Sequence, residues 1–166
     1  MEFFQYLAPT KVIFGRGTEA RTGALCKEAG ATKVLIHYGG HSAKKSGLID
    51  RICASLQAEG ISYTELGGVV PNPRLSKVYE GIELGRKEKI DFILAVGGGS
   101  VIDSAKAIAV MAANPGDLWD YIANGTGKGQ PIKNKPLPIV AISTTAGTGS
   151  EVTASAVITD TERNYK

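Results

Sequence analysis

Histidine and cysteine are scarce in this sequence, which has two of each among 166 residues. Cys26 and Cys53 form no CxxC pair, so neither a zinc site nor a disulfide framework is expected, and both fit small buried hydrophobes. His37 and His41 are four residues apart, but the glycines between them oppose a helix. The histidines therefore do not predict a metal site.

Long apolar runs and clusters of like charge are also absent. No stretch of about 18 apolar residues occurs, so no transmembrane helix is expected. The first residues, MEFFQYLAPTK, lack the basic start and the apolar core of a signal peptide, which favours a cytoplasmic location. The net charge is only +3, and no more than two Lys or Arg residues are adjacent. Neither a nucleic acid nor a membrane is therefore a predicted partner.

What the sequence does have is 21 glycines and an alternation of strand-like apolar runs with helix-like apolar stripes. Strands are expected at 10–14, 33–37, 61–66, 91–96, 138–143 and 155–159, and helices at 18–29, 46–60, 75–89 and 101–112. The apolar runs at 91–96 and 138–143 indicate strands buried on both faces. The sequence therefore predicts an α/β fold, with a Rossmann-like, doubly wound, mainly parallel sheet in one domain over residues 1–166.

Three consecutive glycines stand between the strand expected at 91–96 and the helix that follows. Gly97, Gly98 and Gly99 would let a phosphate approach the backbone without meeting a Cβ. The first N–H groups of the helix would point at that phosphate, and the Ser100 hydroxyl could donate a further hydrogen bond. This pattern favours a phosphate or pyrophosphate site, and a tight turn with Ser100 as an ordinary N-cap is the alternative.

Two further features lie near this turn. Asp103 is one helical turn in and off the apolar stripe, so it either faces a ligand or forms an i,i+3 pair with Lys106. The loop TTAGTGSEVT (144–153) follows the strand expected at 138–143 and combines hydroxyls with glycines. Ligands of doubly wound sheets bind beyond the carboxyl ends of the strands. The two loops together predict a site for an elongated anionic ligand such as a dinucleotide. The segment GRGTEA (15–20) matches a Rossmann fingerprint only weakly, because no carboxylate ends the second expected strand.

GGGSVIDSAK, the PNP triplet at 71–73 and TTAGTGSEVT together resemble the iron-containing (group III) alcohol dehydrogenases. HYGGHSAKKSG is similar to their butanol dehydrogenase-like branch. The resemblance runs along the whole chain and implies the family's N-terminal NAD(P)-binding domain, with a dehydroquinate synthase-like fold. Carried over by motif, it implies cofactor contacts at Gly40, Ser42, Asn72, Gly98, Gly99, Ser100, Asp103, Thr144, Thr145, Thr148, Thr153 and Lys166. The pyrophosphate would lie on Gly98–Ser100, the nicotinamide end near Asp103, and adenine and ribose between the threonines.

One position bears on the choice of cofactor. NAD-preferring members of the family carry an aspartate after the second strand, where it binds the ribose hydroxyls. This sequence has Gly40 there, with Ser42 nearby. Glycine and serine leave space and a donor for a 2′-phosphate, so NADP is expected to be preferred over NAD.

The family's second, helical domain supplies one aspartate and three histidines to a divalent metal, usually iron or zinc. Two histidines cannot provide that set, so we expect the metal-binding domain to be absent from this chain, which would then hold no catalytic or metal-binding residue. The expected function is the cofactor-binding part of a metal-dependent alcohol dehydrogenase or aldehyde reductase. Hydride would pass between NAD(P)H and a primary alcohol/aldehyde pair, and the chain alone would be inactive. A homodimer would fit the family. A stand-alone nucleotide-binding module without catalysis and a glycerol dehydrogenase-like polyol oxidoreductase are the alternatives.

Overall fold

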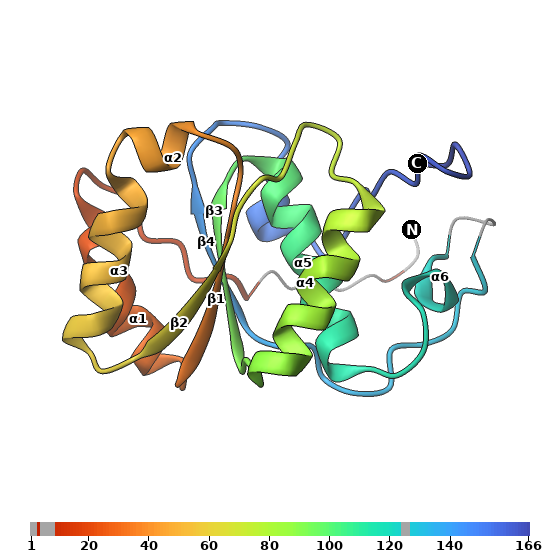
Figure 1. The fold of residues 1–166 in the computed structure, drawn as a ribbon, viewed down its shortest axis with the longest axis horizontal. Coiled ribbons are helices and arrows are strands. Elements are labelled where there is room, and N and C mark those ends of the chain that lie inside the picture. The colour runs from red at the N-terminus through yellow and green to blue at the C-terminus, as the bar shows by residue number, and fades with distance from the viewer. Residues whose placement is uncertain (1–2, 4–8, 124–126) are drawn as a thin grey trace.

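The computed structural model describes residues 3, 9–123 and 127–166 and has a four-stranded parallel sheet at its centre. The strands are β1 (Lys33–Tyr38), β2 (Ser62–Leu66), β3 (Phe92–Gly97) and β4 (Ile139–Ser143), in the order β2-β1-β3-β4. The helices are α1 (Thr22–Glu28), α2 (Ser42–Lys45), α3 (Leu48–Ala58), α4 (Leu75–Glu88), α5 (Gly99–Ala113) and α6 (Leu118–Tyr121), with short 3-10 turns at Thr18–Arg21 and Ser150–Val152. Figure 1 shows α1 and α3 on one side of the sheet and α4 and α5 on the other. The predicted α/β, doubly wound fold is confirmed.

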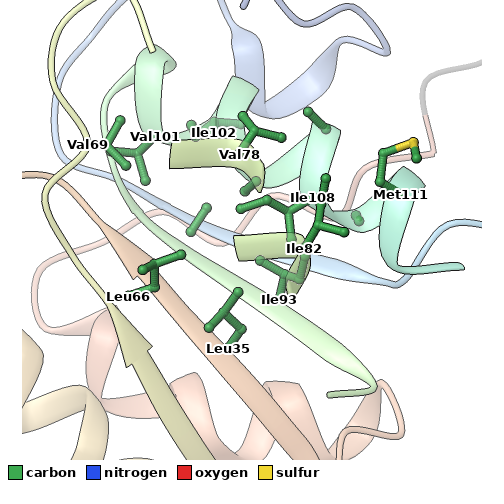
Figure 2. Packing of buried hydrophobic residues seen from close by; sticks show 14 of the residues in the cluster. Leu35, Leu66, Val69, Val78, Ile82, Ile93, Val101, Ile102, Ile108 and Met111 are labelled. Carbon is green, nitrogen blue, oxygen red and sulfur yellow. The ribbon is translucent and has the colours of Figure 1, made fainter. Parts of the chain in front are cut away.

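Alternating side chains of each strand supply two separate apolar layers, because successive residues point to opposite faces of a sheet. Leu35 and Ile93 pack with α4 and α5 in one cluster, part of which is drawn in Figure 2. Ile36 and Leu94 pack with α1 and α3 in the other. All four side chains are fully buried. Burial on both faces is the reason that these strands read as continuous apolar runs.

The direction of winding reverses between β1 and β3. After β1 the chain passes through α3 to β2 on one side, and then returns through α4 to place β3 on the other side of β1. From β3 it continues through α5 to β4, which lies beyond β3. The loops after the two central strands therefore lead away from each other at the carboxyl edge of the sheet. Ligands of open α/β sheets bind at this point of reversal.

Two of the expected strands are absent from the described residues. Residues 10–14 have no regular structure, and Val12 and Phe14 are 68% and 99% exposed, because no described strand pairs with them. The segment at 15–20 consequently follows no strand, which removes the context that a Rossmann fingerprint needs. Residues 155–159 form only an isolated bridge, from Thr159 to Arg74. The expectation that β4 is buried on both faces was also wrong, because β4 is an edge strand and is half-buried.

The helical segment expected from residue 18 begins there, as a 3-10 turn, whereas the helix expected from residue 46 begins at Leu48. Gly17 and Gly47, both in the left-handed conformation, occupy the N-cap positions of the Thr18–Arg21 turn and of α3. The Ser46 hydroxyl instead donates to the Ala43 carbonyl and so closes α2, a short helix that the sequence analysis did not predict. A serine hydroxyl can satisfy a carbonyl of the preceding turn as readily as an N–H of the following one.

Both cysteines lie in helices and are free thiols, but Cys53 of α3 is only half-buried, so the expectation of a buried side chain was wrong there. Cys26 of α1 is fully buried, and burial raises the pKa of its thiol to about 11. Across the described ranges, the structure contains no helix with the length and apolarity needed to span a membrane.

His37 is a buried polar residue near the end of β1, which the sequence analysis considered only as a possible metal ligand together with His41. Its side chain is fully buried, with Nδ1 3.1 Å from the Leu66 carbonyl and Nε2 2.8 Å from Ser104 Oγ. A neutral ring satisfies both contacts, since Nδ1–H donates to Leu66 and the Ser104 hydroxyl donates to Nε2. Burial lowers the pKa of His37 to about 4. His37 therefore joins β1, β2 and α5 as an uncharged linker.

We expect the chain to lose stability in mildly acidic solution because of His37. A histidine in the unfolded chain has a pKa of about 6.5. As the pH falls below that value the unfolded state gains a proton that the folded state takes up only near pH 4, so the free energy of unfolding falls. Between pH 7 and pH 5 the loss attributable to this residue is about 2 kcal/mol, measured by urea unfolding at the two pH values. His37→Gln should flatten this dependence and His41→Gln, at an exposed position, should not. An equal slope in both variants would assign the effect to other groups.

Candidate functional site

The turn from β3 into α5 leaves backbone donors free at the carboxyl edge of the sheet. The N–H groups of Val101 and Ile102 both donate to the Gly98 carbonyl, at 3.0 and 3.2 Å. Those of Gly99 and Ser100 precede the first helical hydrogen bonds and have no backbone acceptor among the described residues. Gly99 is exposed and Ser100 is half-buried. Two N–H groups and the positive end of a fifteen-residue helix thus meet at an open surface.

The three glycines of this turn have different reasons to be glycine. A Cβ at Gly97 would lie 2.5 Å from Val101 Cγ2, so packing against α5 excludes a side chain there. A Cβ at Gly98 would come no closer than 3.6 Å to Thr145, and one at Gly99 no closer than 3.8 Å to Ser150. Both are ordinary contact distances, and neither glycine has a positive φ. Packing therefore accounts for Gly97 alone, and the space above Gly98 and Gly99 is available to a ligand.

The loop after β4 is brought to the same turn, as predicted. The Thr144 N–H donates to the Gly97 carbonyl at 3.1 Å, and the Thr145 side chain lies beside Gly98. Thr144 and Thr145 are both exposed, and Thr148 is exposed further along the loop. The Thr145 hydroxyl therefore borders the open surface above Gly98, whereas no described contact places the Thr148 side chain there.

Asp103 and Lys106 tie this loop to α5. The Asp103 carboxylate accepts hydrogen bonds from the Ser150 hydroxyl and, at 3.0 Å, from the Val157 N–H. Lys106 Nζ lies 3.7 Å from Asp103 and donates to Ser150 at 3.1 Å and to Thr153 Oγ1 at 3.4 Å. Burial lowers the pKa of Lys106, and the Asp103 carboxylate opposes that shift. The i,i+3 pair of Asp103 and Lys106 is thus present. The Asp103 carboxylate and the Thr153 hydroxyl, both expected to contact the cofactor, are hydrogen-bonded to other residues of the protein.

The loop after β1 forms the other side of the site. The Gly39 carbonyl accepts from the Gly68 N–H at 2.9 Å, and a Cβ at Gly39 would lie 3.8 Å from the first turn of α5, at Val101 Cγ2. Gly40 is exposed, with no atom within 4 Å of the place its Cβ would take. Ser42, also exposed, begins α2. The turn expected to receive the ribose is therefore open and beside α5.

Asn72 and Lys166 are 94 positions apart but are hydrogen-bonded in the structure, with Lys166 Nζ 2.6 Å from Asn72 Oδ1. The Thr159 N–H donates to the Pro73 carbonyl at 2.8 Å and so holds the two segments together. A cavity of about 360 Å³ lies between them, lined by Pro71, Asn72, Arg74, Thr159, Thr161 and Lys166. The sequence analysis missed Arg74 and the two threonines, because no spacing in the sequence showed that these segments meet.

The histidines that the structure describes are not placed to bind a metal ion. Both ring nitrogens of His37 are occupied inside the core, and His41 is exposed at the turn after β1. In residues 3, 9–123 and 127–166, no three or more His, Cys, Asp or Glu side chains lie close enough together to hold a metal.

Comparison with protein families identifies the chain. The family model described as iron-containing alcohol dehydrogenase matches residues 9–166. The chain belongs to the iron-containing alcohol dehydrogenase family. The resemblance inferred from GGGSVIDSAK, PNP and TTAGTGSEVT is thus confirmed, and these motifs provide the exposed turn, the cavity segment and the loop described above.

Individual members of the iron-containing alcohol dehydrogenase family are similar to the whole chain. It is 46% identical to the probable NADH-dependent butanol dehydrogenase 1 of Bacillus subtilis, covering 100% of this chain and 41% of that protein. It is 44% identical to the NADH-dependent butanol dehydrogenase A of Clostridium acetobutylicum, covering 98% and 40%. The crystal structure of NADH-dependent butanol dehydrogenase A from Thermotoga maritima superposes with a TM-score of 0.91 at 47% identity, covering 98% of this chain and 40% of that one. The chain thus spans about two fifths of the length of these relatives.

Proposed function

We propose that this chain binds a nicotinamide dinucleotide across the carboxyl edge of its sheet, with the pyrophosphate on Gly98, Gly99 and Ser100. The observation that carries the proposal is that packing does not require glycine at positions 98 and 99, while the N–H groups of Gly99 and Ser100 in the same turn have no backbone acceptor among the described residues. The loop 144–153 lies on one side of this pyrophosphate site, and the turn at Gly39–Gly40 lies on the other. The Asn72–Lys166 cavity lies between the PNP segment that follows β2 and the segment around Thr159, and it offers a second polar region to an elongated ligand.

In a protein of its relatives' length, we propose that this domain orients NAD(P)H for hydride transfer to and from a primary alcohol/aldehyde pair. The chain's own part is to hold the phosphates and ribose, so that the nicotinamide is presented at one place. The residues that the structure describes include no group of side chains placed to hold a metal. The substrate domain and metal ligands would come from another part of such a protein. A homodimer and a cytoplasmic location stay predictions.

Preference for NADP(H) over NAD(H) is part of the proposal. Its support is the open space at Gly40, the exposed Ser42 hydroxyl and the lack of a carboxylate at the turn after β1. The relatives are named NADH-dependent, which favours NAD(H) in those enzymes. Fluorescence titration of the chain with NADPH and NADH separates the two readings. We expect NADPH to bind more tightly, and tighter binding of NADH would overturn the preference.

An aspartate at position 40 should reverse this preference. Its carboxylate would repel a 2′-phosphate and accept hydrogen bonds from unmodified ribose hydroxyls. We expect Gly40→Asp to weaken NADPH binding roughly tenfold and to leave NADH binding equal or tighter. Gly40→Asn has nearly the same shape without the charge and should have the smaller effect. If both variants lower the affinities for NADPH and NADH by the same factor, position 40 affects binding through the size of its side chain and not through repulsion of the 2′-phosphate.

A further inference from the structure

Lys44, Tyr38 and Glu65 form a polar cluster at the carboxyl ends of β1 and β2. Lys44 Nζ lies 3.2 Å from Glu65 Oε2 and 5.3 Å from the centre of the Tyr38 ring. The Tyr38 hydroxyl donates to the same Glu65 oxygen at 2.9 Å. Tyr38 is the last residue of β1, and Glu65 pairs in register with Ile36, two residues earlier, so both side chains leave the same face of the sheet. One carboxylate thus receives a cation and a phenol beside the Gly39–Gly40 turn.

The cluster lies next to the turn that we propose receives the adenosine ribose. Gly40 precedes α2 by two residues, and Lys44 is in the single turn of that helix. The Lys44 side chain is 57% exposed and that of Glu65 is 35% exposed. Such exposed ion pairs contribute little to folding, so the fold does not depend on this one. Lys44 is therefore a cation at the edge of the site whose charge is already balanced.

We propose that the Lys44–Glu65 ion pair sets the cofactor selectivity of this chain, with Lys44 as the cation that a 2′-phosphate recruits and Glu65 as the residue that holds it back. The inference rests on the proposed dinucleotide binding and names a determinant of its specificity. A bound NADPH would draw Lys44 from Glu65 to its phosphate, whereas NADH would leave the pair intact. Glu65 thereby limits the advantage that the open Gly40 turn gives to NADPH.

The exchange leaves no group unpaired. When Lys44 turns to a phosphate, Glu65 keeps the hydrogen bond from the Tyr38 hydroxyl and remains partly exposed to water. Lys44 exchanges one anionic oxygen partner for another, and no proton has to move. Glu65 acts through Lys44 and is a positioning residue, since none of its described contacts reaches the glycine turn.

The test is to titrate NADPH and NADH against the chain and two charge variants. Glu65→Gln releases Lys44 and should tighten NADPH binding about fivefold while NADH binding stays within twofold. Lys44→Gln should weaken NADPH binding about tenfold and leave NADH binding unchanged. Lys44→Arg keeps the charge and should retain most of the NADPH affinity that Lys44→Gln loses. Lys45→Gln is the matched control, because it removes the same charge one residue along from an exposed position that has no ion pair among the described residues.

Different outcomes separate this inference from the proposed function. If Lys45→Gln weakens NADPH as much as Lys44→Gln, or if Glu65→Gln changes both dinucleotides alike, the Lys44–Glu65 pair does not set selectivity, while dinucleotide binding stands. If the unaltered chain binds neither NADPH nor NADH, the proposed function is wrong, and the selectivity mechanism falls with it.

Discussion

Replacing Gly99 by aspartate is expected to weaken dinucleotide binding strongly without unfolding the chain. The new Cβ would lie 3.8 Å from Ser150 Cβ, an ordinary contact, so the fold accepts it. A carboxylate in the first turn of α5 interacts favourably with the helix dipole, which contributes about 0.3–1 kcal/mol to stability. The same carboxylate would occupy the proposed pyrophosphate seat and repel both phosphates. We therefore expect opposite signs in the two measurements, with affinity falling by roughly a hundredfold or more.

The two measurements are an NADPH fluorescence titration and a thermal unfolding midpoint. Gly99→Asn is the control for shape, because its side chain is nearly isosteric with aspartate but uncharged. It should lose less affinity than Gly99→Asp and should not share the gain in the unfolding midpoint. Unchanged affinity in Gly99→Asp would contradict the proposed seat directly, because no ligand held there could ignore a carboxylate above the first helical N–H groups.

Gly23→Ala is expected to lower the free energy of unfolding more than any of the other substitutions proposed above. Gly23 lies in α1 where that helix crosses α3, and its N–H donates to Ser55 Oγ at 2.9 Å. An alanine Cβ would lie 2.0 Å from the Ser55 carbonyl oxygen and 2.6 Å from its carbon. Both are backbone atoms of a helix, so no side-chain rotation relieves the overlap and the two helices must separate. We expect a loss of about 3 kcal/mol, near the upper end for overpacking.

This prediction runs against helix propensity, which by itself favours alanine over glycine by about 1 kcal/mol. Urea unfolding of Gly23→Ala beside Gly40→Ala measures the difference, since no atom lies within 4 Å of a Cβ at Gly40. The control should stay within about 0.5 kcal/mol of the unaltered chain. A more stable Gly23→Ala protein would show that α1 and α3 do not approach each other this closely.

The sequence alone determined the elements whose signals are local. The apolar runs at 33–37 and 91–96 and the helix expected at 75–89 agree with β1, β3 and α4 to within a residue or two. The turn at Gly97, Gly98 and Gly99 was also predicted correctly from the sequence. A strand followed by GGGS and then by an apolar helical stripe places those glycines at the start of a helix. Parallel order and two covered faces followed from apolar runs with no polar alternation. The motifs also carried the family, which the comparisons confirm.

Only the tertiary structure decided which of these local features meet and which pack. The structure shows that the Val101 side chain leaves no room for a Cβ at Gly97. A Cβ at Gly98 or Gly99 would make only ordinary contacts, so packing does not require glycine at those two positions. The structure also brought Asn72 to Lys166 and paired Lys44 of α2 with Glu65 of β2, and within the described ranges it gave residues 10–14 no strand partner. The physical reason is that helix periodicity and turn preference are properties of a few adjacent residues. Contact distance, burial and charge pairing depend instead on atoms that the chain brings together from far apart.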